Sequence, residues 1–117
     1  MRYALVNGDV VIADDDGALR WRGKPLGCSV KAVSPIDDTD AVVLLDYMCR
    51  RTKFENLIRL HADGTVAWQA SLPSGTINDS FVSFRWVDER LIANTWSGYR
   101  VQIDVNDGHI ASSDFVK

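Results

Sequence analysis

Three short stretches of this sequence repeat one arrangement, in which an Asp-Gly turn separates two runs of β-forming residues. The turns are Asp16-Gly17, Asp63-Gly64 and Asp107-Gly108. Their glycines stand 47 and 44 residues apart, and a fixed period of roughly 20–50 residues is the signature of a repeat architecture such as the β-propeller. The repeat therefore constrains the fold more strongly than any single residue does.

The rest of the chain divides into short strands separated by turn residues. Asn7-Gly8 is a strong hairpin signal between the first two strands, and the apolar run 41–45 has the character of a strand buried on both faces. Residues 80–87 alternate with a period of two, and no window shows a capped helical period. We predict an all-β antiparallel meander of about eleven short strands in two and a half propeller-blade-like repeats, forming an open curved sheet or a two-layer sandwich.

Length and charge narrow the class of protein. The 117 residues suit a single all-β domain over 1–117. With 13 basic and 16 acidic residues and no basic run, the chain is not expected to bind nucleic acid directly. No segment reaches the ~20 apolar residues of a membrane span, and the N-terminus lacks a signal-peptide core, so a cytoplasmic location without membrane contact is expected. In that reducing compartment Cys28 and Cys49 are expected to be free thiols.

The residue types needed for catalysis or metal binding form no motif. His61, His109 and the two cysteines are widely scattered for a zinc site. The run Asp14-Asp15-Asp16 lacks the alternating ligands of a calcium loop. No phosphate-binding loop or nucleophile motif occurs. We therefore expect no enzyme, no metal and no cofactor.

Acidic loops and turn aromatics remain as candidate binding features. Clustered aspartates steer a basic partner, and rigid aromatic rings gain contact area at little entropic cost. The alternatives are that the loops are merely solvated and that the rings fold back over a sheet edge. The candidate partner-binding residues are Asp14, Asp15, Asp37, Asp38, Asp40, Tyr47, Trp96 and Tyr99.

The unit 90–111, Arg-Leu-Ile-Ala-Asn-Thr-Trp-Ser-Gly-Tyr-Arg-Val-Gln-Ile-Asp-Val-Asn-Asp-Gly-His-Ile-Ala, resembles a blade of the quinoprotein-like (PQQ-like) β-propellers. Trp21 and Trp68 lie where that family's repeat has its tryptophan, and Ser112 replaces the third. A closed propeller needs typically about 4–8 blades, more than this chain supplies. The resemblance therefore implies propeller-type blades but neither a ring closed by one copy nor a quinone cofactor.

The overall character, a small acidic β domain without a catalytic motif, resembles that of bacterial immunity proteins that protect a cell from polymorphic or contact-dependent toxins. That resemblance implies a non-enzymatic protein that neutralises a cognate toxin, for example a nuclease, by capping its basic active-site face. The alternative is a self-assembling propeller-like structural or interaction module that forms a homo-oligomer through its open edge strands. Recovery of a basic partner would favour the first hypothesis, and a defined homo-oligomer the second.

Overall fold

A computed structural model describes residues 1–50, 52–75 and 78–116. In this part of the chain the backbone forms short strands and two single-turn 3-10 helices, η1 (Pro25–Gly27) and η2 (Tyr47–Cys49). The strands are β1 (Arg2–Val6), β2 (Asp9–Ala13), β3 (Leu19–Gly23), β4 (Val30–Pro35), β5 (Asp40–Leu45), β6 (Leu57–His61), β7 (Val66–Gln69), β8 (Phe81–Val87), β9 (Arg90–Thr95), β10 (Tyr99–Ile103) and β11 (Ile110–Phe115).

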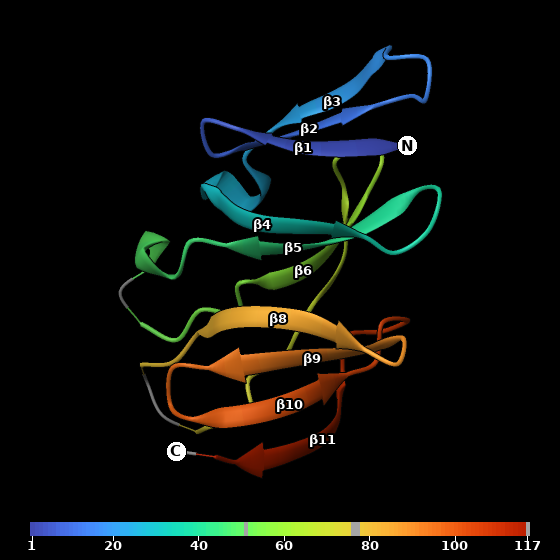
Figure 1. Ribbon diagram of the computed structural model, residues 1–117. Helices are drawn as coiled ribbons and strands as arrows, with labels where there is room; N and C mark the ends of the chain where they lie inside the picture. Colours follow the sequence, from blue (N-terminus) through green and yellow to red (C-terminus); the bar gives the residue numbers. More distant parts are fainter. Residues whose placement is uncertain (51, 76–77, 117) are drawn as a thin grey trace.

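The strands form three antiparallel sheets of consecutive strands, which we call blades 1, 2 and 3. Blade 1 has the order β1-β2-β3, blade 2 the order β4-β5-β6-β7 and blade 3 the order β11-β10-β9-β8. The blades follow one another along the length of the molecule (Figure 1). The all-β class, the eleven strands and the propeller-type repeat are thus confirmed. The sequence left two arrangements possible, an open curved sheet and a two-layer sandwich; in the structure the strands form three separate sheets.

Blade 1 lacks one strand that blades 2 and 3 possess. The three Asp-Gly turns join β2 to β3, β6 to β7 and β10 to β11, which makes β2, β6 and β10 equivalent. Counting back from these strands, β1 corresponds to β5 and β9, whereas β4 and β8 have no counterpart in blade 1. We call β4 and β8 the inner strands of their blades. In the described residues blade 1 therefore has one strand fewer than blades 2 and 3, and β1 is an edge strand.

Two hydrophobic cores hold the blades together, one at each contact between blades. β5 supplies both cores, as the apolar run predicted: Val43 and Leu45 belong to the core beside blade 1, and Val42 and Leu44 to the core beside blade 3. All four side chains are at most 5% exposed. The alternation of a strand sends successive side chains to opposite faces, so one apolar strand holds two neighbours.

A tryptophan from each of the first two blades docks on the Asp-Gly turn of the next blade. The indole of Trp21 lies so close to Gly64 that a Cβ there would overlap the ring. Trp68 covers Gly108 in the same way, with its ring atoms 2.7 Å from the place of a Cβ, and its Nε1 donates a hydrogen bond to the carbonyl of Val105 at 2.7 Å. The repeated glycines are therefore required for packing between blades as well as for the turn.

This docking stops at both ends of the row of blades. Gly17, the equivalent turn glycine in blade 1, has nothing within 4 Å of its would-be Cβ. In blade 3 the place of the docking tryptophan is taken by Ser112, an exposed residue of β11. The described chain thus shows two docking contacts between its three blades.

Asn56 is a buried polar link between blades 2 and 3. Its Nδ2 donates hydrogen bonds of 2.8 Å to the carbonyls of Leu45 and Phe81, and its Oδ1 accepts one of 2.7 Å from the amide of Phe81. The side chain is fully buried. Its amide group therefore supplies the hydrogen-bond partners that the backbone of Phe81 would otherwise lack where the chain enters β8.

Cys28 and Cys49 form a disulfide, so the prediction of free thiols is wrong. The two residues are 21 positions apart in sequence, and their Cα atoms lie 5.8 Å apart. The loop after η1 and the end of η2 lie side by side because β4 and β5, which separate these segments in sequence, form an antiparallel pair. Local spacing could not reveal this long-range contact.

Removing the disulfide should lower the free energy of unfolding by about 3 kcal/mol, because the bond closes a loop of this length in the unfolded chain. The measurement is urea unfolding of the wild type with and without reductant. The double variant Cys28→Ser/Cys49→Ser is the control, since reductant should not change its unfolding midpoint. Equal stability of oxidised and reduced wild type would contradict the prediction.

Candidate functional site

The acidic residues gather at one end of the strands. In antiparallel sheets alternate turns lie at the same end, and Figure 1 shows the β2–β3, β4–β5 and β8–β9 turns on one side of the molecule. Together with the β6–β7 and β10–β11 turns they form a surface that we call the acidic end. Most of the chain's 16 acidic residues lie in or beside these turns: Asp14, Asp15, Asp16, Asp37, Asp38, Asp40, Asp63, Asp88, Glu89, Asp104 and Asp107.

A network of charged groups fixes the β4–β5 turn within the acidic end. Asp40 is 4% exposed, and its Oδ2 accepts a hydrogen bond of 2.6 Å from Arg59 Nε, while its Oδ1 lies 3.0 Å from His61 Nδ1. Arg59 also pairs with Asp37 at 3.3 Å and donates to the carbonyl of Val105 in blade 3 at 2.8 Å. Asp40, one of the carboxylates predicted to bind a partner, therefore holds the β4–β5 turn in place.

The same network shifts the pKa values of Asp40 and Tyr3. Burial acts to raise the pKa of the Asp40 carboxyl, but hydrogen bonds from His61 and Arg59 outweigh it and lower that pKa from its ordinary 3.8. The pKa of Tyr3 rises to about 12, first because the ring is partly buried and then because the charges of Asp40 and Asp37 lie nearby. Asp40 is consequently charged at neutral pH and contributes an ion pair to the folded state.

Because the folded pKa of Asp40 lies below the unfolded one, its stabilising contribution is complete above about pH 4 and is lost as the pH falls through the lowered folded value. We expect the free energy of unfolding of Asp40→Asn to depend less on pH than that of the wild type below pH ~4. Chemical unfolding between neutral and acid pH measures this. The variant Asp38→Asn, in the same turn, is the control, and identical slopes for Asp40→Asn and wild type would contradict the expectation.

The other predicted carboxylates are more open. Asp15 lies 3.1 Å from the N-terminal ammonium, and its side chain is 85% exposed. Asp14 is 3.6 Å from Arg20, and Asp38 is exposed at the tip of the β4–β5 turn. Asp15 and Asp38 are thus the candidate acidic residues best placed to meet another molecule.

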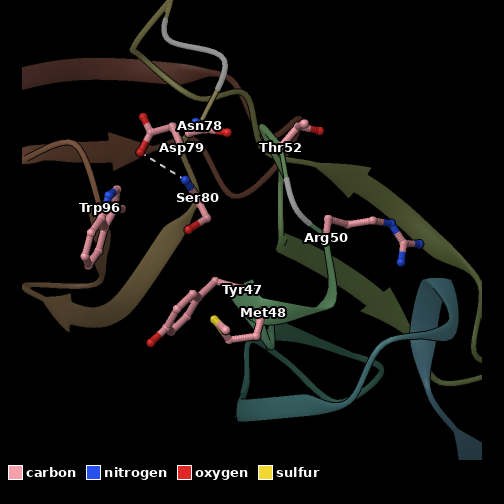
Figure 2. A pocket seen from close by; sticks show the side chains of 8 residues that line it. All are labelled: Tyr47, Met48, Arg50, Thr52, Asn78, Asp79, Ser80 and Trp96. Atoms are coloured by element: carbon pink, nitrogen blue, oxygen red, sulfur yellow. Dashed lines mark hydrogen bonds between the residues drawn. The ribbon is translucent and has the colours of Figure 1, made fainter.

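Two predicted aromatic residues meet at a cleft at the opposite end of the strands. Figure 2 shows Tyr47, from η2, and Trp96, from the turn after β9, on its two sides. The cleft has a volume of about 440 Å³, and we call it the aromatic cleft. Met48, Trp96 and Tyr47 are 75%, 63% and 41% exposed. It is lined by Tyr47, Met48, Arg50, Thr52, Asn78, Asp79, Ser80 and Trp96.

Both walls of the aromatic cleft are held by specific bonds. On the η2 side, Asp46 caps the turn by accepting a 2.9 Å hydrogen bond from the amide of Met48, and the disulfide ties down Cys49. On the other side, buried Asp79 accepts hydrogen bonds from the amide and hydroxyl of Ser97 at 3.0 and 2.7 Å. Asp79 is not among the residues predicted from the sequence, where only its position before an alternating strand distinguishes it.

Tyr99 does not line the aromatic cleft. Its ring packs edge-on against Phe115 of β11, with 5.3 Å between ring centroids, and it contacts the core between blades 2 and 3. The structure therefore brings together Tyr47 and Trp96, leaves Tyr99 in a structural contact, and separates all three from the acidic end.

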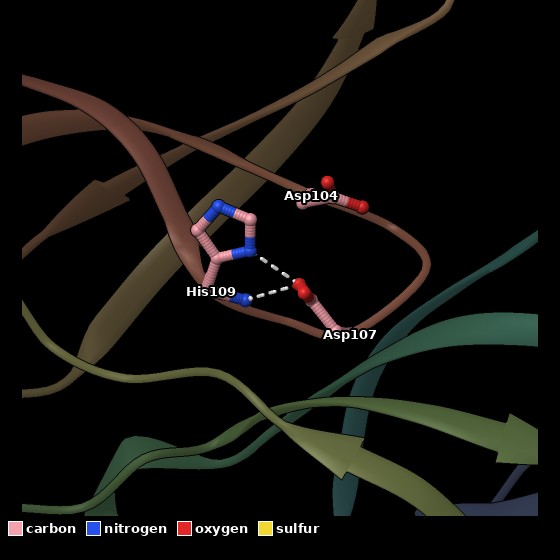
Figure 3. A group of neighbouring side chains, drawn as sticks. All are labelled: Asp104, Asp107 and His109. Atoms are coloured by element: carbon pink, nitrogen blue, oxygen red, sulfur yellow. Dashed lines mark hydrogen bonds and ion pairs between the residues drawn. The ribbon is translucent and has the colours of Figure 1, made fainter.

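One group of side chains in the described residues has the composition of a metal site. Asp104, Asp107 and His109 each offer one ligand atom, and these atoms lie within 4.8 Å of one another (Figure 3). His109 Nδ1 is 2.5 Å from Asp107 Oδ1, and this hydrogen bond raises the pKa of the imidazole. The amide of His109 donates to the same oxygen. These bonds shape the β10–β11 turn, and an ion would have to compete with them.

Comparison with known proteins identifies a family and a fold. Residues 26–115 match the model of a family described as "Domain of unknown function (DUF7957)". No curated protein matches the chain. Among solved structures, BamB from Moraxella catarrhalis is 17% identical with a TM-score of 0.57, and the computationally designed Ika8 protein is 13% identical with a TM-score of 0.59. The chain is covered to 99% and 98%, but it spans only 35% and 36% of their lengths, so these likenesses establish the fold alone.

Proposed function

The chain belongs to the DUF7957 family, and we propose that it is a non-enzymatic protein-binding module whose partner docks at the aromatic cleft. One observation carries the proposal: Tyr47, Met48 and Trp96 expose large apolar side chains around a single cleft. Scattered apolar residues are normal on a surface, whereas a contiguous group marks a binding site. Aromatic residues and methionine are also enriched in protein interfaces.

The framework of the aromatic cleft supports the same proposal. The Cys28–Cys49 disulfide, the Asp46 cap and the Asp79 hydrogen bonds fix the backbone on both sides. A partner then does not have to order these segments when it binds, which lowers the entropic cost of association. Trp96 is the expected anchor, because it is the largest exposed ring at the site.

Trp96→Ala should weaken partner binding by about 30-fold or more, the effect of losing a hot spot of ~2 kcal/mol. The partner would be recovered from native lysate with tagged protein and its affinity for each purified variant measured by calorimetry. Leu19→Ala is the matched control, because Leu19 is 65% exposed but lies in blade 1 beside the acidic end. Equal affinities of Trp96→Ala and wild type would refute docking at the cleft.

A second proposal places the partner at the acidic end in place of the aromatic cleft: the partner is then a bacterial toxin, for example a nuclease, whose basic active-site face is capped by the acidic end. Its support is the collection of five acidic turns on one surface, with Asp15 and Asp38 open to solvent. Such a surface accelerates association with a basic partner and suppresses association with an acidic one. On this hypothesis the protein acts as an immunity protein.

Reversal of charge at the acidic end tests this second proposal. Asp15→Lys/Asp38→Lys should slow association with a basic toxin at least tenfold at low salt and should reduce protection in cells that express both proteins. Asp114→Lys, on β11 outside the acidic end, should leave association within twofold of wild type. If the two charge reversals behave alike, the acidic end is not the binding surface.

The disulfide also indicates in which cellular compartment the protein would act. Disulfides persist in oxidising compartments and are rare in the cytosol, so we propose an oxidising location in place of the cytoplasmic one expected from the sequence. Within the described residues, no helix has the length and apolar character to cross a membrane. Alkylation of thiols in intact cells provides the test: unmodified Cys28 and Cys49 support the proposal, and modified ones refute it.

A further inference from the structure

β1 differs from every other edge strand of the described blades. The edge strands are β1, β3, β4, β7, β8 and β11. Five of them pair with their neighbour through a register shift, which bends the strand, whereas the β1–β2 ladder is regular along its whole length. Bulges are one of the devices by which proteins keep edge strands from pairing with other chains. β1 lacks that protection.

The side chains of β1 are mostly exposed and mostly uncharged. Leu5 and Val6 are 40% and 39% exposed, and Arg2, at the first position, is the one charged residue of the strand. β4, by comparison, carries Lys31 and ends at Pro35. Charges and proline discourage strand addition. The sequence of β1 therefore permits pairing with another strand, whereas the sequence of β4 opposes it.

Some hydrogen-bonding groups of β1 point to the side on which blades 2 and 3 have their inner strands. Asn7 and Gly8 have φ values of 52° and 81°, which is the conformation of a two-residue hairpin turn. In such a hairpin Val6 exchanges backbone hydrogen bonds with β2, and so do the residues two and four positions before it. The N–H and C=O groups of Tyr3 and Leu5 therefore point away from β2, where β4 and β8 pair with their blades.

We propose that β1 of a second copy of this chain fills that place, so that each copy completes blade 1 of the other. A two-fold axis at Ala4 makes the two β1 strands antiparallel, the orientation that the inner strands have to their neighbours in blades 2 and 3. Tyr3 and Leu5 of one copy then exchange four backbone hydrogen bonds with Leu5 and Tyr3 of the other.

The side chains of β1 fit this self-pairing. The small Ala4 faces its own equivalent at the axis, where non-hydrogen-bonded pairs approach most closely. Tyr3 stands opposite exposed Leu5 and Arg2 opposite Val6, so aromatic–aliphatic contacts form and no like charges meet. This interface is distinct from the aromatic cleft and does not depend on the proposed function.

Solution mass gives the first test. The mass of the wild type should rise with concentration from 13.0 kDa towards twice that value in sedimentation or light-scattering measurements. Leu5→Pro removes an outward N–H that the β1–β2 ladder does not use, so it should keep the fold and remain at one chain. A wild type that stays monomeric, or a Leu5→Pro variant that associates equally well, overturns the proposal.

Cysteine cross-linking tests the register independently of stability. Across the proposed axis the Ala4 Cα atoms lie about 4.5 Å apart, within reach of a disulfide. Ala4→Cys should therefore form a covalent dimer under mild oxidation. Val6→Cys is the matched control, because its two copies would lie roughly 14 Å apart along the strands. Equal cross-linking of the two variants, or none in either, contradicts the pairing, as does pairing of β1 with a strand of a different protein.

Discussion

Replacing Gly64 by alanine should lower the free energy of unfolding by about 4 kcal/mol, because two costs add. Gly64 has a φ of +87°, a left-handed conformation that a Cβ disfavours. The new Cβ would also overlap the indole of Trp21 and force it out of its place between blades 1 and 2. Denaturant unfolding followed by circular dichroism measures the loss.

Gly17→Ala separates the two costs. Gly17 occupies the equivalent turn with a φ of +91°, but nothing lies within 4 Å of its would-be Cβ. The strained backbone alone should cost about 1–2 kcal/mol. The difference between the two variants isolates the tryptophan docking. If both lose the same stability, Trp21 contributes nothing to the contact between the blades.

The largest loss is expected for Asn56→Ala, about 5 kcal/mol. The substitution leaves the carbonyl of Leu45 and both backbone groups of Phe81 without their side-chain partner in a buried position. Each unsatisfied buried group costs roughly 1–3 kcal/mol, and the small cavity adds to this. The variant should unfold at a much lower urea concentration than the wild type.

Asn94→Ala is the control for Asn56→Ala. Asn94 is an asparagine of β9 whose Nδ2 donates to Ser83 Oγ at 3.2 Å on the surface. Because water replaces a surface partner, its loss should stay below about 1 kcal/mol. Comparable losses for the two variants would show that Asn56 does not link the blades. An unchanged crystal structure of Asn94→Ala would confirm that this control perturbs only the surface.

Local features of the fold were predictable from the sequence. The Asn7-Gly8 hairpin, the buried strand 41–45 and the three Asp-Gly turns all depend on neighbours within a few residues, and the structure contains each of them. Phe81 departs from the period-two alternation of residues 80–87. Alternation places it on the face of Ser83, but the register shift after it turns it to the core face with Phe84. A bulge of one residue is invisible to a period of two.

Contacts between distant segments were not predictable. The disulfide, the Asn56 link and the meeting of Tyr47 with Trp96 all depend on how one blade packs against the next. Sequence reasoning could propose Tyr47 and Trp96 as exposed rings, because each follows a strand end, but not that they share one cleft. For the same reason it treated Asp40 as a free carboxylate, although Arg59 and His61 enclose it.

The presence of two separate cores has a consequence for the way the chain unfolds. Blade 1 is joined to the rest through one core, whereas blade 2 lies between two. Proteins built as a row of units behave as linear arrays, in which the stability of each unit depends on its own bonds and on its nearest neighbours. Loss of blade 1 can therefore occur as a local opening that leaves the core between blades 2 and 3 intact. In native-state hydrogen exchange, amides of β2 should open at a lower free energy than those of β5, which lies between the two cores, although both strands lie in the middle of a sheet.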